Sequence, residues 1–172
     1  MSNKTRLVSY VLFVVGAVLL TGALLFTLHT NRTADTELGH NVPQTIADFA
    51  LAQVITGQNA VESIQQLHGK DFRLVDGVVA TYGDQNATLW VSDAGSVSAA
   101  ADLTELMKTR IAEGNSPFVM FGDFDLDGFT VYALEGIGQA HYYWQVNELV
   151  LWLAVDVDFA EQAVRETVAY YQ

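Results

Sequence analysis

The order of apolar and polar positions divides the chain into an uncharged opening run and a longer, mixed remainder. The run, residues 7–28, holds no charged side chain. As a helix it would be ~33 Å long at ~1.5 Å per residue, which matches the ~30 Å hydrocarbon core of a bilayer. Lys4 and Arg6 precede it, and positive charge favours the cytoplasmic side. We therefore predict a signal anchor, a single transmembrane helix at 7–28, with residues 1–6 in the cytoplasm and the rest of the chain extracytoplasmic.

A cleaved signal peptide and a pilin-like assembly helix are the alternative interpretations of this run. A signal peptide has a shorter apolar region of ~7 to 15 residues that ends at small residues, and residues 29–34 offer no such cleavage site. A pilin-like helix would follow a processing site and carry an early glutamate, and we find neither in the sequence. Both alternatives therefore fit the sequence less well than a retained anchor.

Small residues form one stripe along the predicted anchor. Ser9, Gly16 and Ala23 recur at every seventh position, and small side chains allow helices to approach closely in lipid. We predict that this stripe contacts a transmembrane helix of another subunit. The alternative is that the stripe only reflects the general abundance of glycine and alanine in membrane-spanning helices.

The remainder of the chain predicts a polar linker followed by one folded domain. Residues 29–42 show no hydrophobic periodicity, whereas residues 43–172 alternate between helix-like and strand-like patterns, so we predict an extracytoplasmic α+β domain there. Pro43 suits a first helical turn, and apolar residues follow at helical spacing up to Val54. A second short helix is expected over residues 60–67.

A weak internal repeat organises the rest of the domain. When the chain is shifted by 62 positions, residues 79–107 lie over residues 141–169, and each copy predicts strand, tight turn, strand and helix. Ser96 or Ser98 can cap the first helix, and Asp158, at the position that matches Ser96, can cap the second, where Glu161 would complete a capping box. A true duplication and a chance similarity of two ββα units both remain open. The four strands are expected at residues 78–82, 87–92, 140–145 and 149–155.

Residues 118–134, between the two copies, predict a hairpin. Apolar runs flank an acidic loop, and Asp127-Gly128 is a strong signal for a two-residue turn. With these two strands the sheet has about six, mostly antiparallel, and we expect the helices to cover it from one side. The predicted fold class is therefore α+β, with one N-terminal transmembrane helix before the domain.

The acidic loop is the motif that most suggests metal chemistry. Asp123, Asp125, Asp127 and Gly128 reproduce the D-x-D-x-D-G opening of a calcium loop, in which alternate oxygens converge on a hard cation. The resemblance to an EF-hand covers only six residues, because the twelfth loop position holds Leu134 in place of glutamate. Calcium is therefore a candidate ligand, and the alternative is a charged hairpin tip that keeps the domain soluble. We expect no other cofactor.

A second dense cluster is aromatic and lies in the second copy of the repeat. Alternation along a strand places Tyr142 and Trp144 on one face and His141 and Tyr143 on the other. We expect one face to lie under the helices and the other to expose amphipathic rings, which are common at protein contacts. Tyr142 and Trp144 are therefore the predicted partner-binding residues of the domain, with core packing as the alternative.

Composition narrows the classes of function. The formal net charge is −12, and all 20 acidic residues follow the apolar run, which argues against nucleic acid and anionic lipid headgroups as partners. The sequence contains no cysteine, so it can form no disulfide, thiolate zinc site or iron–sulfur cluster. The domain must therefore be stabilised by packing alone.

The sequence also lacks the common catalytic motifs, including G-x-S-x-G, H-E-x-x-H and a Gly-rich phosphate loop. An enzyme would need a deep pocket beside His68 or His141 with converging carboxylates, and we do not expect one. We predict a non-catalytic, single-pass protein of the cell membrane. It would be an accessory or assembly subunit of a larger membrane complex that contacts other subunits through its transmembrane helix and an exposed aromatic face. The alternative is an anchored binding domain for calcium or a small ligand.

Overall fold

The computed structural model describes residues 41–68, 73–114 and 116–172. Within these ranges no helix combines the length and the apolar character needed to cross a bilayer. Most of the predicted linker lies outside the described residues. So do the predicted transmembrane helix and its small-residue stripe, Ser9, Gly16 and Ala23.

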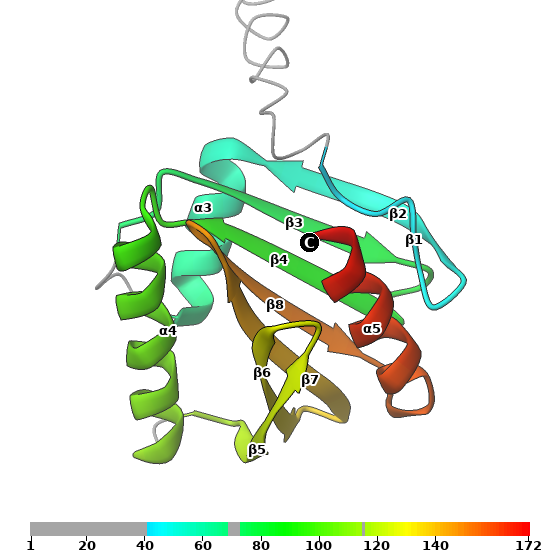
Figure 1. Cartoon of the computed structure of the whole chain (residues 1–172). Helices are drawn as coiled ribbons and strands as arrows, with labels where there is room; N and C mark the ends of the chain where they lie inside the picture. The colour runs from blue at the N-terminus through cyan, green and yellow to red at the C-terminus, as the bar shows by residue number, and fades with distance from the viewer. Residues whose placement is uncertain (1–40, 69–72, 115) are drawn as a thin grey trace, which may run out of the picture. The chain divides into compact units, whose positions relative to one another are not determined.

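One antiparallel sheet forms the centre of the described domain (Figure 1). Its eight strands lie in the spatial order β1-β2-β3-β4-β8-β7-β6-β5, and helices accompany them, so the predicted α+β class is confirmed. The strands are β1 (Thr45–Ile46), β2 (Phe49–Thr56), β3 (Asp76–Tyr82), β4 (Ala87–Asp93), β5 (Val119–Leu126), β6 (Phe129–Gly136), β7 (Gln139–Val146) and β8 (Leu149–Val155). The helical elements are α3 (Gly57–His68), α4 (Val97–Ala112), the 3-10 turn η1 (Val157–Phe159) and α5 (Ala160–Tyr170).

The strands from β3 to β8 are the ones that the sequence predicts, and the sheet has two further strands at its N-terminal end. The predicted hairpin turn is also present. Leu126 pairs with Phe129 across it, and Asp127 and Gly128 have φ angles of 53° and 88°. Positive φ at both central residues matches the right-handed twist of the flanking strands.

The predicted helix from Pro43 to Val54 is wrong, because this segment forms the β1-β2 hairpin. The chain reverses at Ala47 and Asp48, whose φ angles are 48° and 67°. The backbone N–H of Ala47 donates to Oε2 of Glu166 in α5 at 2.7 Å. A carboxylate from far along the chain therefore stabilises the hairpin, and the helical spacing of the apolar residues does not determine the local structure.

The start of the described chain is tied to the C-terminal helix and to the sheet. The hydroxyl of Tyr171 donates to the carbonyl oxygen of Asn41 at 2.8 Å. The hydroxyl of Tyr82 donates to the carbonyl oxygen of Pro43 at 3.0 Å. Val42, between them, is only 2% exposed and belongs to the core. We call residues 41–48 the N-terminal clasp.

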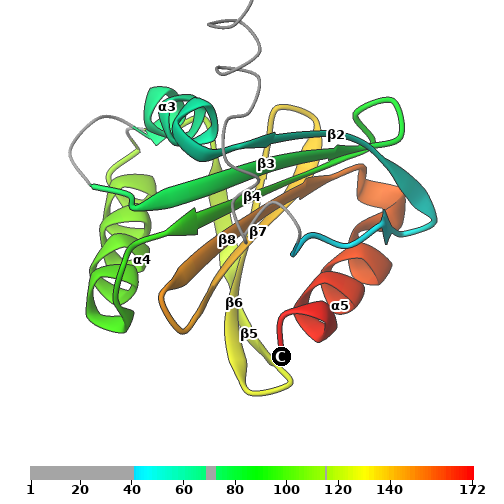
Figure 2. The ribbon, with the colours of Figure 1, turned by 90° about the horizontal axis from the view of Figure 1, so that it is seen from above.

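The helices cover both faces of the sheet, so the prediction of a single covered side is wrong. Helices α3 and α4 lie on one side and α5 lies on the other (Figures 1 and 2). Trp90 and Trp152 pack under α4 on what we call the α4 face, whereas Leu89 and Leu151 pack under α5 on the α5 face. The β8 sequence LVLWLAV is apolar throughout, as is typical of a strand that is buried on both faces.

The internal repeat holds for β4 and β8, is shifted at β3 and β7, and ends at the helices. Trp90 pairs across the sheet with its repeat equivalent, Trp152, so a local two-fold axis perpendicular to the sheet relates β4 to β8. The outer strands β3 and β7 follow this axis with a shift of two residues, because a four-residue turn joins β3 to β4 and a two-residue turn joins β7 to β8. The shift is even, so Tyr82 and Trp144 are both buried on the α5 face. Such an axis maps each face of the sheet onto itself, whereas α4 and α5 cover opposite faces. The symmetric unit is therefore a hairpin and not a complete ββα unit.

The two helices that follow the hairpins begin differently. Ser96 caps α4 as predicted, because its Oγ accepts from the N–H of Ala99 at 3.2 Å. The predicted cap at Asp158 is wrong. This residue lies inside η1, and α5 begins after Phe159 without a side-chain cap. The extra 3-10 turn is the local feature that distinguishes the second copy from the first.

Candidate functional site

A cavity of about 370 Å³ lies between α4 and the α4 face of the sheet. On the helix side it is lined by Leu103 and Met107, which are buried, and by Leu106, which is half-buried. The indole rings of Trp90 and Trp152 line it on the sheet side. We call this cavity the α4 pocket. Its position follows from the amphipathic pattern of α4, whose apolar side faces the sheet.

A histidine and a tryptophan form a hydrogen-bonded pair in the wall of the pocket. Nε1–H of Trp152 donates to Nδ1 of His141 at 3.1 Å, and Nε2 of His141 lies 3.0 Å from the carbonyl oxygen of Gly136. The indole nitrogen can only donate, so Nδ1 accepts and Nε2 carries the proton. The ring of Phe118 packs on both, with centroids 4.6 Å from His141 and 5.0 Å from Trp152. Both imidazole nitrogens are thus engaged in the neutral tautomer, which suits a structural role better than proton transfer.

The burial of His141 predicts a loss of stability in mild acid. Desolvation lowers the pKa of His141 from its ordinary value of 6.5, and the hydrogen bond to Gly136 opposes this effect. The unfolded chain therefore binds this proton more readily, so the stability that His141 contributes is complete above pH 6.5 and is lost as the pH falls below it.

The measurement is the free energy of unfolding in urea across this pH range. The His141→Gln variant is the control, because an amide can accept from Trp152 and donate to Gly136 without titrating. We expect the variant to show a shallower decline on acidification. An identical decline in both proteins would contradict the assignment.

Most polar groups that line the pocket are already hydrogen-bonded. Nε2 of Gln139 donates to the carbonyl oxygen of Gln85 at 3.3 Å and to Oδ1 of Asp156 at 3.1 Å. Oγ of Ser116 accepts from the N–H of Phe118 at 3.2 Å. None of the described residues that line the pocket carries a carboxylate.

The β6-β7 turn places a strained apolar residue at the pocket. Ile137 has a φ angle of 54°, and its side chain is 76% exposed although it lines the cavity. A β-branched residue in this conformation is costly, and such strain is concentrated at functional sites. The sequence could have pointed to this residue, since an isoleucine between two glycines is unusual in a hairpin turn. No comparable sequence feature marks the other lining residues.

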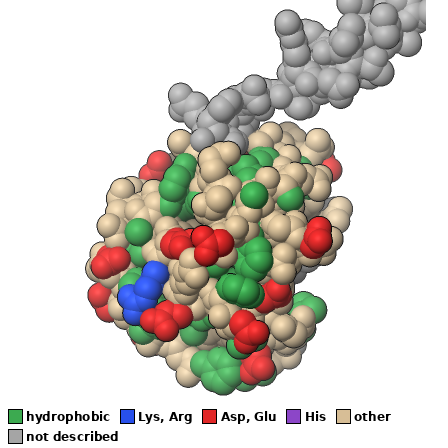
Figure 3. Space-filling model, turned by 90° about the vertical axis from the view of Figure 1, so that its right-hand side faces the viewer, with side chains coloured by type: hydrophobic (Ala, Val, Ile, Leu, Met, Phe, Trp, Pro, Cys, Tyr) green, Lys and Arg blue, Asp and Glu red, His purple; other side chains and the backbone are tan. Residues whose placement is uncertain are grey.

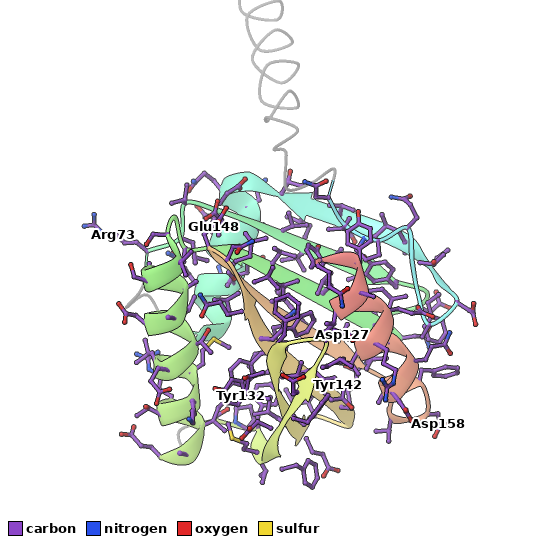
Figure 4. All side chains as sticks on the ribbon, in the orientation of Figure 1. Arg73, Asp127, Tyr132, Tyr142, Glu148 and Asp158 are labelled. Atoms are coloured by element: carbon purple, nitrogen blue, oxygen red, sulfur yellow. The ribbon has the colours of Figure 1, made fainter. Side chains whose placement is uncertain are left out.

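The predicted calcium residues lie at the far end of the β5-β6 hairpin. Asp123 and Asp125 belong to β5, and Asp127 lies in the turn at the tip (Figure 4). Oδ1 of Asp125 accepts from the N–H of Gly128 at 3.3 Å, which stabilises the turn. Among the described residues, no three histidine or acidic side chains gather as a metal ion would require. Calcium binding therefore stays a prediction without an assembled ligand set.

The aromatic cluster is divided between the two covered faces, so the expected exposed aromatic face is not present. Trp144 is fully buried on the α5 face, and Tyr142 is half-buried on the same face. On the α4 face Tyr143 stacks between Tyr132 and Trp152, with centroid distances of 4.6 Å and 5.5 Å. Figure 4 shows Tyr132 and Tyr142 on opposite sides of the sheet. Of the two predicted contact residues, only Tyr142 keeps an accessible surface.

Comparisons with protein-family models, with curated proteins and with solved structures find no match for this chain.

Proposed function

We propose that this chain is a membrane-anchored, non-catalytic binding protein whose extracytoplasmic domain holds a small apolar ligand in the α4 pocket. The observation that carries the proposal is a cavity of about 370 Å³ with mainly apolar walls, which falls within the size range of natural ligand sites, ~300–1,000 Å³. The anchoring part of the proposal rests on the uncharged run at residues 7–28 and its flanking charges.

The hydrogen-bonded state of the pocket supports binding over catalysis. His141 satisfies both ring nitrogens within the protein, and none of the described residues that line the cavity is acidic. A ligand that enters would meet aliphatic and aromatic side chains, whose transfer from water is favourable. The geometry therefore favours retention of an apolar molecule without chemical change.

A variant that fills the pocket tests this proposal. Leu106→Trp adds a bulky ring to the half-buried position on α4 that lines the cavity. It should weaken the binding of N-phenylnaphthylamine, a neutral apolar probe, by about tenfold, which corresponds to ~1.4 kcal/mol. The measurement is fluorescence titration of the full chain in lipid nanodiscs, with empty nanodiscs as the blank.

Two control variants make this titration specific. Leu106→Ala enlarges the cavity and should not weaken binding through a steric effect. Val97→Trp places the same ring on α4 at a position that is 57% exposed and does not line the cavity. If all three variants bind the probe equally, or if the unaltered chain does not bind it, the proposal is wrong.

The edge of the sheet favours a second candidate, an accessory or assembly subunit of a larger membrane complex. Strand β5 ends the sheet, and a bulge between Met120 and Gly122 leaves Phe121 without a cross-strand partner. Phe121 is 71% exposed and Val119 is 67% exposed. Acidic side chains outnumber basic ones on the neighbouring surface around α5 (Figure 3), which would suit a cationic partner.

This second candidate predicts a partner that is lost when the edge is altered. Phe121→Lys should abolish co-purification of a defined subunit after mild extraction from the membrane, because the charge prevents burial of the side chain. Val157→Lys is the matched control, since Val157 is 61% exposed in η1, which follows β8, and the strands β7 and β6 separate β8 from β5 in the sheet. A chain that is extracted alone and monodisperse would contradict this candidate.

A further inference from the structure

Strand β5 is an open edge of the sheet. It stands last in the strand order, so its outer side has no neighbouring strand among the described residues. It spans eight residues, Val119–Leu126, whereas β1 at the opposite edge has only two and belongs to the N-terminal clasp. The N–H and C=O groups along an unpaired edge can form hydrogen bonds with a strand of another chain. β5 is therefore the edge to which a further strand can be added.

The β5-β6 hairpin determines which backbone groups of β5 point outward. Both central residues of its turn have positive φ, and Leu126 pairs with Phe129 across it. In such a two-residue hairpin the pair next to the turn exchanges both of its hydrogen bonds, and bonded and non-bonded pairs then alternate. Phe124 and Leu126 therefore bond to β6, whereas the N–H and C=O groups of Asp123 and Asp125 point to the free edge.

The same two residues give this edge its charge. Asp123 and Asp125 are both exposed, and alternation along the strand places their carboxylates on one face of β5, opposite to Phe124. Oδ1 of Asp125 accepts from the N–H of Gly128. A carboxylate can accept several hydrogen bonds, so this contact leaves the side chain able to pair with a cation. The outward backbone groups and the two negative charges thus lie at the same positions of the edge.

One basic side chain approaches these carboxylates from α4. Nζ of Lys108 lies 5.7 Å from the ring centroid of Tyr132, which is paired with Asp123 across the hairpin. The same Nζ lies 3.8 Å from Oε2 of Glu105. The charge of Lys108 is thus matched by an acid of its own helix, and the carboxylates of β5 keep the edge acidic.

A second copy of the chain is a poor occupant of this edge. Antiparallel pairing of two β5 strands about Phe124 would place Asp123 of each copy opposite Asp125 of the other. Like charges that lie directly opposite each other destabilise a sheet, whereas opposite charges stabilise it. A strand with lysine or arginine at the facing positions would have its Cβ atoms ~5 Å from those of the two aspartates. The edge therefore discriminates in favour of a basic strand.

From these observations we infer that β5 accepts an extended segment of a partner protein as an additional antiparallel strand, with basic side chains opposite Asp123 and Asp125 and apolar side chains between them. The apolar side chains would pack beside Phe124, which is 39% exposed and whose ring centroid lies 6.3 Å from that of Tyr142. This inference rests on the second candidate function, because it specifies the contact that the partner makes at the same edge.

A short peptide of alternating lysine and valine, TKVKVKT, tests strand addition directly. The measurement is fluorescence anisotropy of the labelled peptide with the full chain in phosphatidylcholine nanodiscs, at physiological ionic strength and with empty nanodiscs as the blank. The control peptide carries N-methyl groups on its lysine backbone nitrogens, which preserves the charge and removes the N–H groups that would face β5. We expect it to bind about tenfold more weakly. Equal binding of both peptides would indicate simple attraction between charges and overturn the inference.

Matched variants separate the charge of the edge from its backbone. Asp123→Asn removes the carboxylate and keeps the outward N–H, and it should weaken binding of the basic peptide about threefold. Asp123→Pro removes both groups, and proline is tolerated on an edge strand where its nitrogen faces solvent. It should weaken binding by a further factor of about three. Asp127→Asn removes the same charge from the turn, outside β5, and should change binding much less.

The two asparagine variants decide the test even if the proline variant does not fold, which circular dichroism would reveal. Equal weakening by Asp123→Asn and Asp127→Asn would mean that only the overall charge matters, and the inference would be wrong. A dimer of the unaltered chain that is lost in Phe121→Lys would identify a second copy as the occupant, which would also overturn it.

The outcomes also distinguish the inference from the candidate function. If the basic peptide does not bind, but Phe121→Lys still abolishes co-purification of a subunit, the edge is an interface and addition of a basic strand is wrong. If the peptide binds with the expected pattern and the chain is extracted alone, the assembly role is wrong and the chemistry of the edge stands.

Discussion

Replacement of Trp152 by alanine should lower the free energy of unfolding by about 3–5 kcal/mol, the usual cost of truncating a large buried aromatic residue. Trp152 is 7% exposed and lies on β8, between β4 and β7 in the sheet. Its ring stacks on Tyr143 with an interplanar angle of 10° and also contacts Phe118. Urea unfolding followed by circular dichroism measures the change.

A matched pair of milder variants isolates the hydrogen bond of Trp152. Trp152→Phe and Trp144→Phe remove the same atoms from two buried sites. Nε1 of Trp152 donates to His141, whereas the buried Nε1 of Trp144 has no hydrogen-bond partner among the described residues. Because only the first variant leaves an unpaired acceptor, it should cost ~1–2 kcal/mol more than the second. Equal costs would show that the hydrogen bond contributes nothing to stability.

Gly136→Ala should lower the free energy of unfolding by about 1–3 kcal/mol, more than any other small substitution in the sheet, because it forces a well-packed region apart. A Cβ atom at this position would lie 2.5 Å from Cδ1 of Phe118 and 2.9 Å from the carbonyl oxygen of Pro117. The backbone oxygen cannot rotate away, so the segment around Pro117 must shift. Since Phe118 lines the α4 pocket, probe binding should weaken together with stability.

Gly128→Ala is the control for this effect. Gly128 has a φ angle of 88°, and a Cβ atom there would meet nothing within 4 Å. The free energy of unfolding should fall by ~1 kcal/mol, from the strained backbone conformation alone, and probe binding should not change. Thermal unfolding with probe titration on the same samples checks both expectations. Weaker probe binding in Gly128→Ala, with none in Gly136→Ala, would contradict the packing argument.

The sheet was predictable where local signals determine the structure. The paired hairpins carry alternating or continuous apolar runs and turn residues, and Asp127-Gly128 fixes one register. The β1-β2 hairpin was not predictable in this way. Its reversal at Ala47 depends on the carboxylate of Glu166, which is 119 positions away in the sequence. Helical spacing around Ile46 therefore pointed to the wrong element.

The sequence also indicates that α5 covers a different face of the sheet from α4, although this signal is easily missed. An uninterrupted apolar strand such as Leu149–Val155 indicates that both faces are covered, which requires helices on opposite sides. The pocket could not be predicted, because it depends on where the segment around Phe118 packs relative to His141 and Trp152. These residues are brought together only by tertiary structure.

The N-terminal clasp has a mechanical consequence for the proposed attachment of the domain to a membrane through its N-terminal end. A force transmitted through Asn41 reaches Tyr171 before it reaches β1, and it reaches Glu166 at Ala47, directly after β1. The force would therefore be shared between the first and last segments of the fold, and α5 would resist the displacement of the N-terminal clasp. Removal of α5 should make the domain unfold first at the N-terminal clasp.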